Sequence, residues 1–178
     1  MKDLSMHIID ILQNSTRAKA KNIELLVEED VENDKLTLQF KDDGCGMSEE
    51  MAAKVTDPFV TTRTTRKVGL GLPLLKQNAE ITGGTFELQS QLGKGTTVTA
   101  TFGLSHIDRK PMGDLAGAVV LTMTSYPDIR FVFRYKKQDI DFVLDTDEVH
   151  EALEGVSIQN PEIISYLREM IEENIKPQ

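Results

Sequence analysis

Cysteine is nearly absent from this sequence of 178 residues, which contains a single one, Cys45. One thiol excludes a disulfide framework within the chain and is typical of a reducing compartment. Long hydrophobic runs are missing as well, because no apolar segment approaches the roughly 18 residues that cross a bilayer. The first residues also lack the basic-then-apolar layout of a signal peptide. From these absences we expect a cytoplasmic protein that does not enter a membrane.

Basic residues are fewer than acidic residues in this sequence. The chain has 20 Lys and Arg residues against 29 Asp and Glu residues, which gives a formal net charge of −9. An acidic surface repels the phosphates of nucleic acids and of anionic membranes, so neither is an expected partner. The hydrophobic share of 39% is sufficient for a packed core, and the length suits one domain with or without a small appendage.

Residues 57–84 form the most informative stretch, in which a loop leads into a glycine turn and then into a helix expected at 72–82. The loop is rich in hydroxyl and cationic side chains: Thr61, Thr62, Arg63, Thr64, Thr65, Arg66 and Lys67. Gly69 and Gly71 allow the backbone to approach a ligand closely, and the amino end of the helix offers free N–H groups and a positive dipole end. This combination predicts a polyphosphate site, although a glycine turn alone more often belongs to a surface loop before an ordinary helix.

A helix is expected at residues 3–20, where apolar side chains recur at helical spacing. Its core face carries Leu4, Ile8, Ile11 and Leu12. A second stripe beside this face carries His7, Asp10, Asn14 and Arg17. Asp10 and Asn14 are one turn apart, so both side chains can face the same ligand. In an isolated helix, a solvated polar face is the commoner explanation of such a stripe.

Two alternating runs predict strands at residues 22–30 and 35–43. The second run leads to Asp42, after which Gly44 and Gly46 permit a tight turn. A carboxylate at a strand end can accept a hydrogen bond from the exocyclic amine of a base, but a turn of Asp and Gly is also common without any ligand.

Two more strands are expected at residues 84–90 and 96–104, joined by a turn that contains glycine. The hydroxyl of Thr96, at the end of this turn, can support the same base site.

Residues 105–178 follow as an appendage in which no chemistry is concentrated. Asp114 is expected to cap an apolar helix, and alternating runs on both sides of residues 137–138 predict a β-hairpin. The buried face of this hairpin is expected to carry Ile129, Phe131, Phe133, Ile140, Phe142 and Leu144. Asn160, followed by a proline, starts a final helix. This segment is compatible with simple packing on the main domain and with a surface for a partner or sensor.

Five motifs occur in a fixed order within residues 3–104: Asp10-x-x-x-Asn14, Asp42-x-Gly44-x-Gly46, Asp57-Pro58-Phe59 with its Thr/Arg loop, Gly69-x-Gly71, and Gly93-x-Gly95-Thr96. This order resembles the ATP-binding domain shared by sensor histidine kinases, type II topoisomerases, heat-shock chaperones and mismatch-repair ATPases, the GHKL superfamily. The resemblance implies the Bergerat fold, an α+β two-layer sandwich with a mixed, mainly antiparallel sheet and helices on one face. A histidine kinase-like ATP-binding domain is therefore expected at residues 1–104, and residues 105–178 add a C-terminal β-hairpin and helices.

The resemblance implies that the chain binds ATP and Mg²⁺, with a role for each motif. Asn14 offers its carboxamide oxygen to Mg²⁺, a hard cation that prefers oxygen ligands and phosphate bridging. Asp42 accepts a hydrogen bond from the adenine amino group, and that end of the pocket is completed by Gly44, Gly46 and Thr96. The phosphates are expected to contact Thr62, Arg63, Arg66, Lys67, Gly69, Leu70, Gly71 and Leu72. Asp10 occupies the catalytic position where hydrolytic members carry a general-base Glu.

Two features separate this chain from the hydrolytic members. Asp10 is one methylene shorter than Glu, which puts its role in activating water in doubt. The loop at residues 58–68 is also short, as in histidine kinases. Compared with histidine kinases, however, the sequence lacks the helices that carry a phospho-accepting His. The full length is similar to stand-alone ATP-binding proteins of anaerobic bacteria.

The expected function is that of a nucleotide-dependent regulator of a partner protein. Two alternatives stay open: a protein kinase that acts in trans on a His or Ser of a partner, and a slow ATPase. The resemblance therefore does not decide whether the chain is an enzyme, and it names neither the partner nor the oligomeric state.

Overall fold

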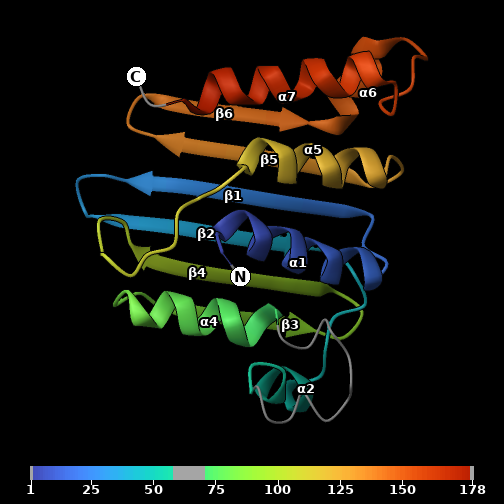
Figure 1. The fold of residues 1–178 in the computed structure, drawn as a ribbon. Coiled ribbons are helices and arrows are strands. Elements are labelled where there is room, and N and C mark those ends of the chain that lie inside the picture. Colours follow the sequence, from blue (N-terminus) through green and yellow to red (C-terminus); the bar gives the residue numbers. More distant parts are fainter. Residues whose placement is uncertain (1, 58–70, 177–178) are drawn as a thin grey trace.

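A computed structural model describes residues 2–57 and 71–176, which fold into a sheet with helices packed against it (Figure 1). The strands are β1 (Asn22–Asp30), β2 (Lys35–Asp42), β3 (Phe86–Gln91), β4 (Gly95–Gly103), β5 (Arg130–Lys137) and β6 (Ile140–Asp145). The helices are α1 (Leu4–Arg17), α2 (Glu49–Lys54), α4 (Gly71–Ile81), α5 (Leu115–Ser125), α6 (Thr146–Leu153) and α7 (Pro161–Ile175).

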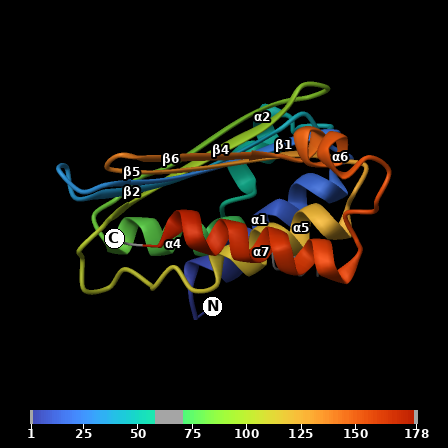
Figure 2. The ribbon, with the colours of Figure 1, turned by 90° about the horizontal axis from the view of Figure 1, so that it is seen from above.

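The six strands form one sheet in the order β3-β4-β2-β1-β5-β6. The β1–β5 pair is parallel, whereas the pairs β1–β2, β2–β4, β3–β4 and β5–β6 are antiparallel. Helices α1, α4, α5 and α7 lie on the same face of the sheet (Figure 2). This arrangement confirms the predicted two-layer sandwich with a mixed, mainly antiparallel sheet.

Helix α1 buries the apolar stripe that its sequence predicts, since Leu4, Ile8, Ile11 and Leu12 are at most 2% exposed. The side chain of Asp3 caps its first turn by accepting a hydrogen bond from the backbone N–H of Met6. The helix ends at Arg17, three residues earlier than expected, because Lys19 takes a left-handed conformation with φ of 60°.

Local cap chemistry sets the start of other helices. Ser48, Asp114 and Asn160 each accept a hydrogen bond from a backbone N–H in the first turn of α2, α5 and α7, respectively. Pro161 follows Asn160 at the first helical position, where a missing N–H does no harm. The predicted starts of α5 and α7 are therefore confirmed.

The hydrophobic core lies between the sheet and the four helices that cover it. The β5–β6 hairpin contributes to this core through Phe131, Phe133 and Leu144, which are buried, and through Ile129, Ile140 and Phe142, which are partly buried. Tyr135 is buried as well, although the sequence pattern did not single it out. The hairpin and its inward face are thus confirmed, while the division of the chain after residue 104 stays a prediction.

Among the described helices, none combines the length and the apolar character needed to cross a membrane.

Candidate functional site

Asp42 lies at the end of β2, where two neighbouring segments hold its carboxylate. The hydroxyl of Ser15, on α1, donates to Oδ2 at 2.6 Å, and the backbone N–H of Gly44 donates to Oδ1 at 2.9 Å. Each carboxylate oxygen can accept more than one hydrogen bond. Asp42 is therefore fixed in direction, is half-buried, and keeps capacity to accept from a ligand.

The turn after Asp42 packs so tightly that no side chain would fit at either of its glycines. A Cβ atom on Gly44 would lie 2.7 Å from the Cβ of Ala18, at the end of α1. Gly46 has φ of 69°, and a Cβ atom there would lie 2.0 Å from the carbonyl oxygen of Gln91. The two glycines thus allow the turn to sit between α1 and the β3–β4 hairpin.

Hydroxyl groups tie the β3–β4 hairpin to this turn. Ser90 Oγ accepts from the backbone N–H of Met47 at 2.8 Å, and it lies 2.8 Å from Oγ1 of Thr96. Thr96 is also the direct β-sheet partner of Asp42. The structure therefore brings Asp42, Thr96 and the glycine turn together, as the sequence predicted.

A second group of residues meets where α1 passes the amino end of α4. A Cβ atom on Gly71 would lie 3.5 Å from Asp10 Oδ2, so the Asp10 carboxylate adjoins the first residue of α4. Burial raises the pKa of Asp10, and the positive charge of Arg17 opposes this shift. The carboxylate thus lies at the helix end where the polyphosphate site is expected.

Asn14 lies on α1 between these two groups. It is one turn beyond Asp10 and directly precedes Ser15, the residue that contacts Asp42. Leu72 is buried in the first turn of α4. The remaining predicted phosphate contacts lie outside the described residues: Thr62, Arg63, Arg66, Lys67, Gly69 and Leu70.

The side chains suit a metal ion that is held largely by phosphates. No group of three or more His, Cys, Asp and Glu side chains able to bind a metal occurs within residues 2–57 and 71–176. Mg²⁺ typically uses one or two protein oxygens together with phosphate oxygens and water. The carboxamide of Asn14 fits that pattern.

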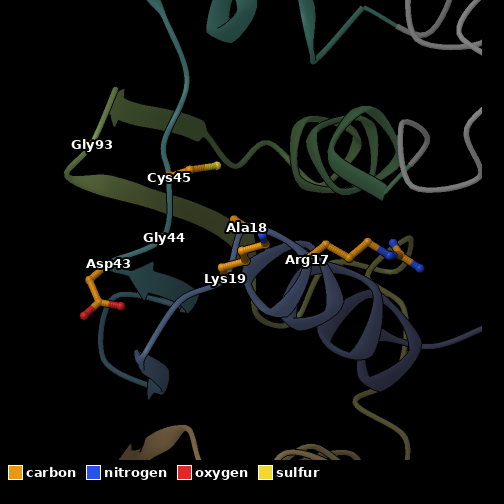
Figure 3. Close-up of a pocket in the computed structure, with 7 residues that line it drawn as sticks. All are labelled: Arg17, Ala18, Lys19, Asp43, Gly44, Cys45 and Gly93. Atoms are coloured by element: carbon orange, nitrogen blue, oxygen red, sulfur yellow. The ribbon is translucent and has the colours of Figure 1, made fainter.

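An open pocket of about 500 Å³ adjoins the turn (Figure 3). Its lining comprises Arg17, Ala18, Lys19, Asp43, Gly44, Cys45 and Gly93. The side chains of Arg17 and Asp43 extend away from each other in this view. This lining shares Gly44 with the turn after Asp42, but it includes none of Asp10, Asn14 and Asp42.

Comparison with known families assigns most of the chain to one family. Residues 2–106 match the family model described as histidine kinase-, DNA gyrase B-, and HSP90-like ATPase. The chain belongs to this family. It therefore contains a GHKL ATPase domain, related to the catalytic domains of histidine kinases, as the five motifs predicted.

Curated relatives of this GHKL domain are much longer proteins. A protein of Shewanella frigidimarina named as a sensor protein is 33% identical over 109 residues, which cover 60% of this chain and 17% of the relative. Sporulation kinase D of Bacillus subtilis is 29% identical over 98 residues, which cover 55% of this chain and 19% of the kinase. The chain thus spans less than a fifth of the length of these relatives.

The fold also occurs in a solved structure, the N-terminal domain of a DNA repair protein. The two chains are 14% identical with a TM-score of 0.53, and the match covers 82% of this chain and 53% of the other. This likeness concerns the fold alone. Its coverage exceeds that of the family match, so the shared fold includes part of the segment after residue 106.

Proposed function

We propose that the GHKL domain binds ATP with Mg²⁺ and acts as a nucleotide-dependent regulator of a partner protein. The single observation that carries the proposal is the paired arrangement along α1. Ser15 orients Asp42 at one end of this helix, and Asp10 adjoins the amino end of α4 toward the other end. Family membership supports a nucleotide as the ligand that spans both groups.

Asp42 is the residue that selects the base. Adenine carries an exocyclic amine that donates to a carboxylate, whereas guanine has a carbonyl at the corresponding ring position. A carboxylate facing that carbonyl would be left unpaired and repelled, which disfavours GTP. Gly44, Gly46 and Thr96 complete this end of the proposed pocket.

The phosphates are proposed to lie at the amino end of α4. Backbone N–H groups at Gly71 and Leu72 and the positive end of the helix dipole suit an anion there. Asn14 would direct its carboxamide oxygen to Mg²⁺, which supplies positive charge against the phosphates. Contributions from Gly69, Leu70 and the cationic loop residues belong to the same proposal.

Hydrolysis or phosphate transfer is the second candidate, and the position of Asp10 favours it. A carboxylate with a raised pKa beside the phosphate site can orient or deprotonate a nucleophile. Its reach is one methylene shorter than that of Glu, which is consistent with slow turnover. The nucleophile would be water in an ATPase, or a His or Ser of a partner in a kinase.

Isothermal titration with ATP, ADP and GTP tests the binding proposal. ATP and ADP should bind with an affinity that depends on Mg²⁺, and GTP should bind much more weakly. Asp42→Ala should weaken ATP binding by about 1–3 kcal/mol, because the buried adenine amine loses its acceptor. Asp139→Asn, which changes an exposed carboxylate in the β5–β6 turn, is the matched control. Equal affinities for ATP and GTP would exclude the adenine assignment.

Labelled ATP separates the candidate functions once binding is established. The γ-labelled nucleotide is incubated with the chain and with proteins that co-purify with it in the presence of ATP. Label on a partner supports a kinase, and free phosphate supports an ATPase. Binding without either product supports a regulator that acts through its nucleotide-bound surface.

A further inference from the structure

A buried polar pair connects α1 to α4 away from the residues proposed to touch the nucleotide. His7 Nε2 lies 2.6 Å from the side-chain nitrogen of Asn78, within hydrogen-bonding distance. His7 is completely buried and Asn78 is half-buried. His7 precedes Asp10 by about one helical turn, and Asn78 follows Gly71 by about two turns.

Apolar side chains are buried on both of these helices. Ile8 and Ile11 of α1 are buried, as are Leu72, Leu75 and Ala79 of α4. Apolar contacts are not directional, so they tolerate sliding of one helix along the other. A hydrogen bond between two fixed side chains is directional and does not. The His7–Asn78 pair is therefore the part of this contact best suited to fix how far α4 extends along α1.

The pair leaves one ring nitrogen of His7 buried without a hydrogen bond in the described part of the chain, which is a cost that an apolar contact would not carry. Burial lowers the pKa of His7 to about 4, so its ring is neutral near pH 7. With the Asn78 amide donating to Nε2, the ring proton sits on Nδ1, which has no hydrogen-bond partner within the described part of the chain. An apolar side chain would fill the same space without this desolvation penalty. The polar pair thus supplies something other than packing stability.

We infer that His7 and Asn78 are positioning residues that fix α4 against α1 and so set the distance between the phosphate-binding helix end and the Asp10–Asn14 stripe. The inference rests on the proposed binding of Mg·ATP. Neither residue touches the nucleotide in this proposal. Without the pair, α4 can settle at other positions along α1, and the phosphate end of the site loses its geometry. The base end is held separately by Ser15, Gly44 and Ser90.

The decisive variant replaces both partners, H7L/N78L, which removes the polar pair without leaving either partner unpaired. We expect this variant to unfold in urea at the parental concentration or higher. Its affinity for Mg·ATP should fall roughly 10-fold or more, as expected for misplaced binding groups. Its affinity for adenosine, which lacks phosphates and is measured by NMR titration, should be unchanged.

His7→Gln is the conservative variant, because its amide oxygen can occupy the position of Nε2 and accept the hydrogen bond from Asn78. It should bind Mg·ATP like the parent, and it keeps the inference testable if H7L/N78L does not fold. Gln77→Leu, an exposed change beside Asn78 on α4, should leave both affinities unchanged.

The outcomes separate this inference from the proposed function. A parent chain that binds neither Mg·ATP nor adenosine contradicts the proposed function itself. If the parent binds Mg·ATP and H7L/N78L binds it equally well, the pair does not position the site. Equal losses for Mg·ATP and adenosine in a folded variant, or a loss in H7Q as large as in the double variant, would also overturn the inference.

Discussion

The hydroxyl of Ser15 sets the direction of the Asp42 carboxylate, because it donates to Oδ2 from the neighbouring helix. We expect Ser15→Ala to leave Asp42 held only through Oδ1 and to weaken ATP binding by about 0.5–1.5 kcal/mol, the net contribution of one hydrogen bond. Isothermal titration would measure the change. Ser125→Ala, at the exposed end of α5, is the control. Parental affinity in Ser15→Ala would mean that the Gly44 amide alone orients the carboxylate.

Asp10 carries a stability penalty at its proposed catalytic position. Its folded-state pKa is raised by burial, so the ionised form opposes folding. The contribution of a carboxyl with a raised pKa is favourable below its unfolded pKa and is lost as the pH rises through the folded pKa. Asp10→Asn removes the charge and should stabilise the nucleotide-free protein near pH 7, with a smaller difference from the parent at acid pH. Urea unfolding at several pH values would measure this.

The same substitution should lower turnover if the chain hydrolyses or transfers phosphate. Asn keeps the size and hydrogen-bonding capacity of Asp but cannot act as a base, so ATP affinity should stay nearly intact while the rate falls roughly 10²-fold or more. Phosphate release is the measurement, with Asp139→Asn as the matched control. An Asp10→Asn variant as fast as the parent would remove Asp10 from the catalytic role.

Residues of the site differ in how far the sequence could identify them. Asp10 and Asn14 share a helical stripe, and Asp42 stands beside its glycines, so spacing along the chain singles them out. Ser15 and Ser90 were missed, because each acts on a residue 27 or 43 positions away. Such contacts depend on the packing of separate elements, which leaves no local pattern.

At the scale of elements, the first residues of helices were easier to predict from the sequence than the last residues. A cap such as Ser48, Asp114 or Asn160 bonds to a backbone group two or three residues away, so its effect is local. The end of α1 depends instead on the turn that follows it, where the Ala18 carbonyl accepts from the Cys45 N–H at 2.9 Å. That tertiary contact accompanies the left-handed conformation of Lys19 and the early end of the helix.

Lys19 offers a direct test of this helix end. Its φ of 60° lies in the left-handed region, which disfavours a residue with a Cβ atom but suits glycine. We expect Lys19→Gly to raise the free energy of unfolding by about 1 kcal/mol, measured by urea denaturation. Lys21→Gly, at a position without positive φ, should not stabilise the chain. A loss of stability in Lys19→Gly would contradict this account.

At the scale of the whole molecule, the sheet connects the family domain to the segment after it. β5 pairs with β1 in parallel, with residues 22–29 opposite residues 130–137. The sequence predicted the β5–β6 hairpin from its alternation, but alternation does not say which strand lies alongside. Helix α5 likewise packs between α1 and α7 in the helical layer (Figure 1). These long-range pairings determine how the two segments form one core.

A fragment ending at residue 106 would test whether the segment after it can be separated. Without residues 107–178, β1 loses its neighbour β5 and α1 loses its neighbour α5. Apolar side chains that are buried in the full chain are then exposed to water. We expect the fragment to melt about 10 °C or more below the full chain, or to unfold without cooperativity. Circular dichroism would follow the transition, and a chain ending at residue 176, which keeps every described element, should melt like the parent. If the fragment has the melting temperature and the ATP affinity of the full chain, residues 1–106 form an independent domain. Residues 107–178 are then a dispensable appendage.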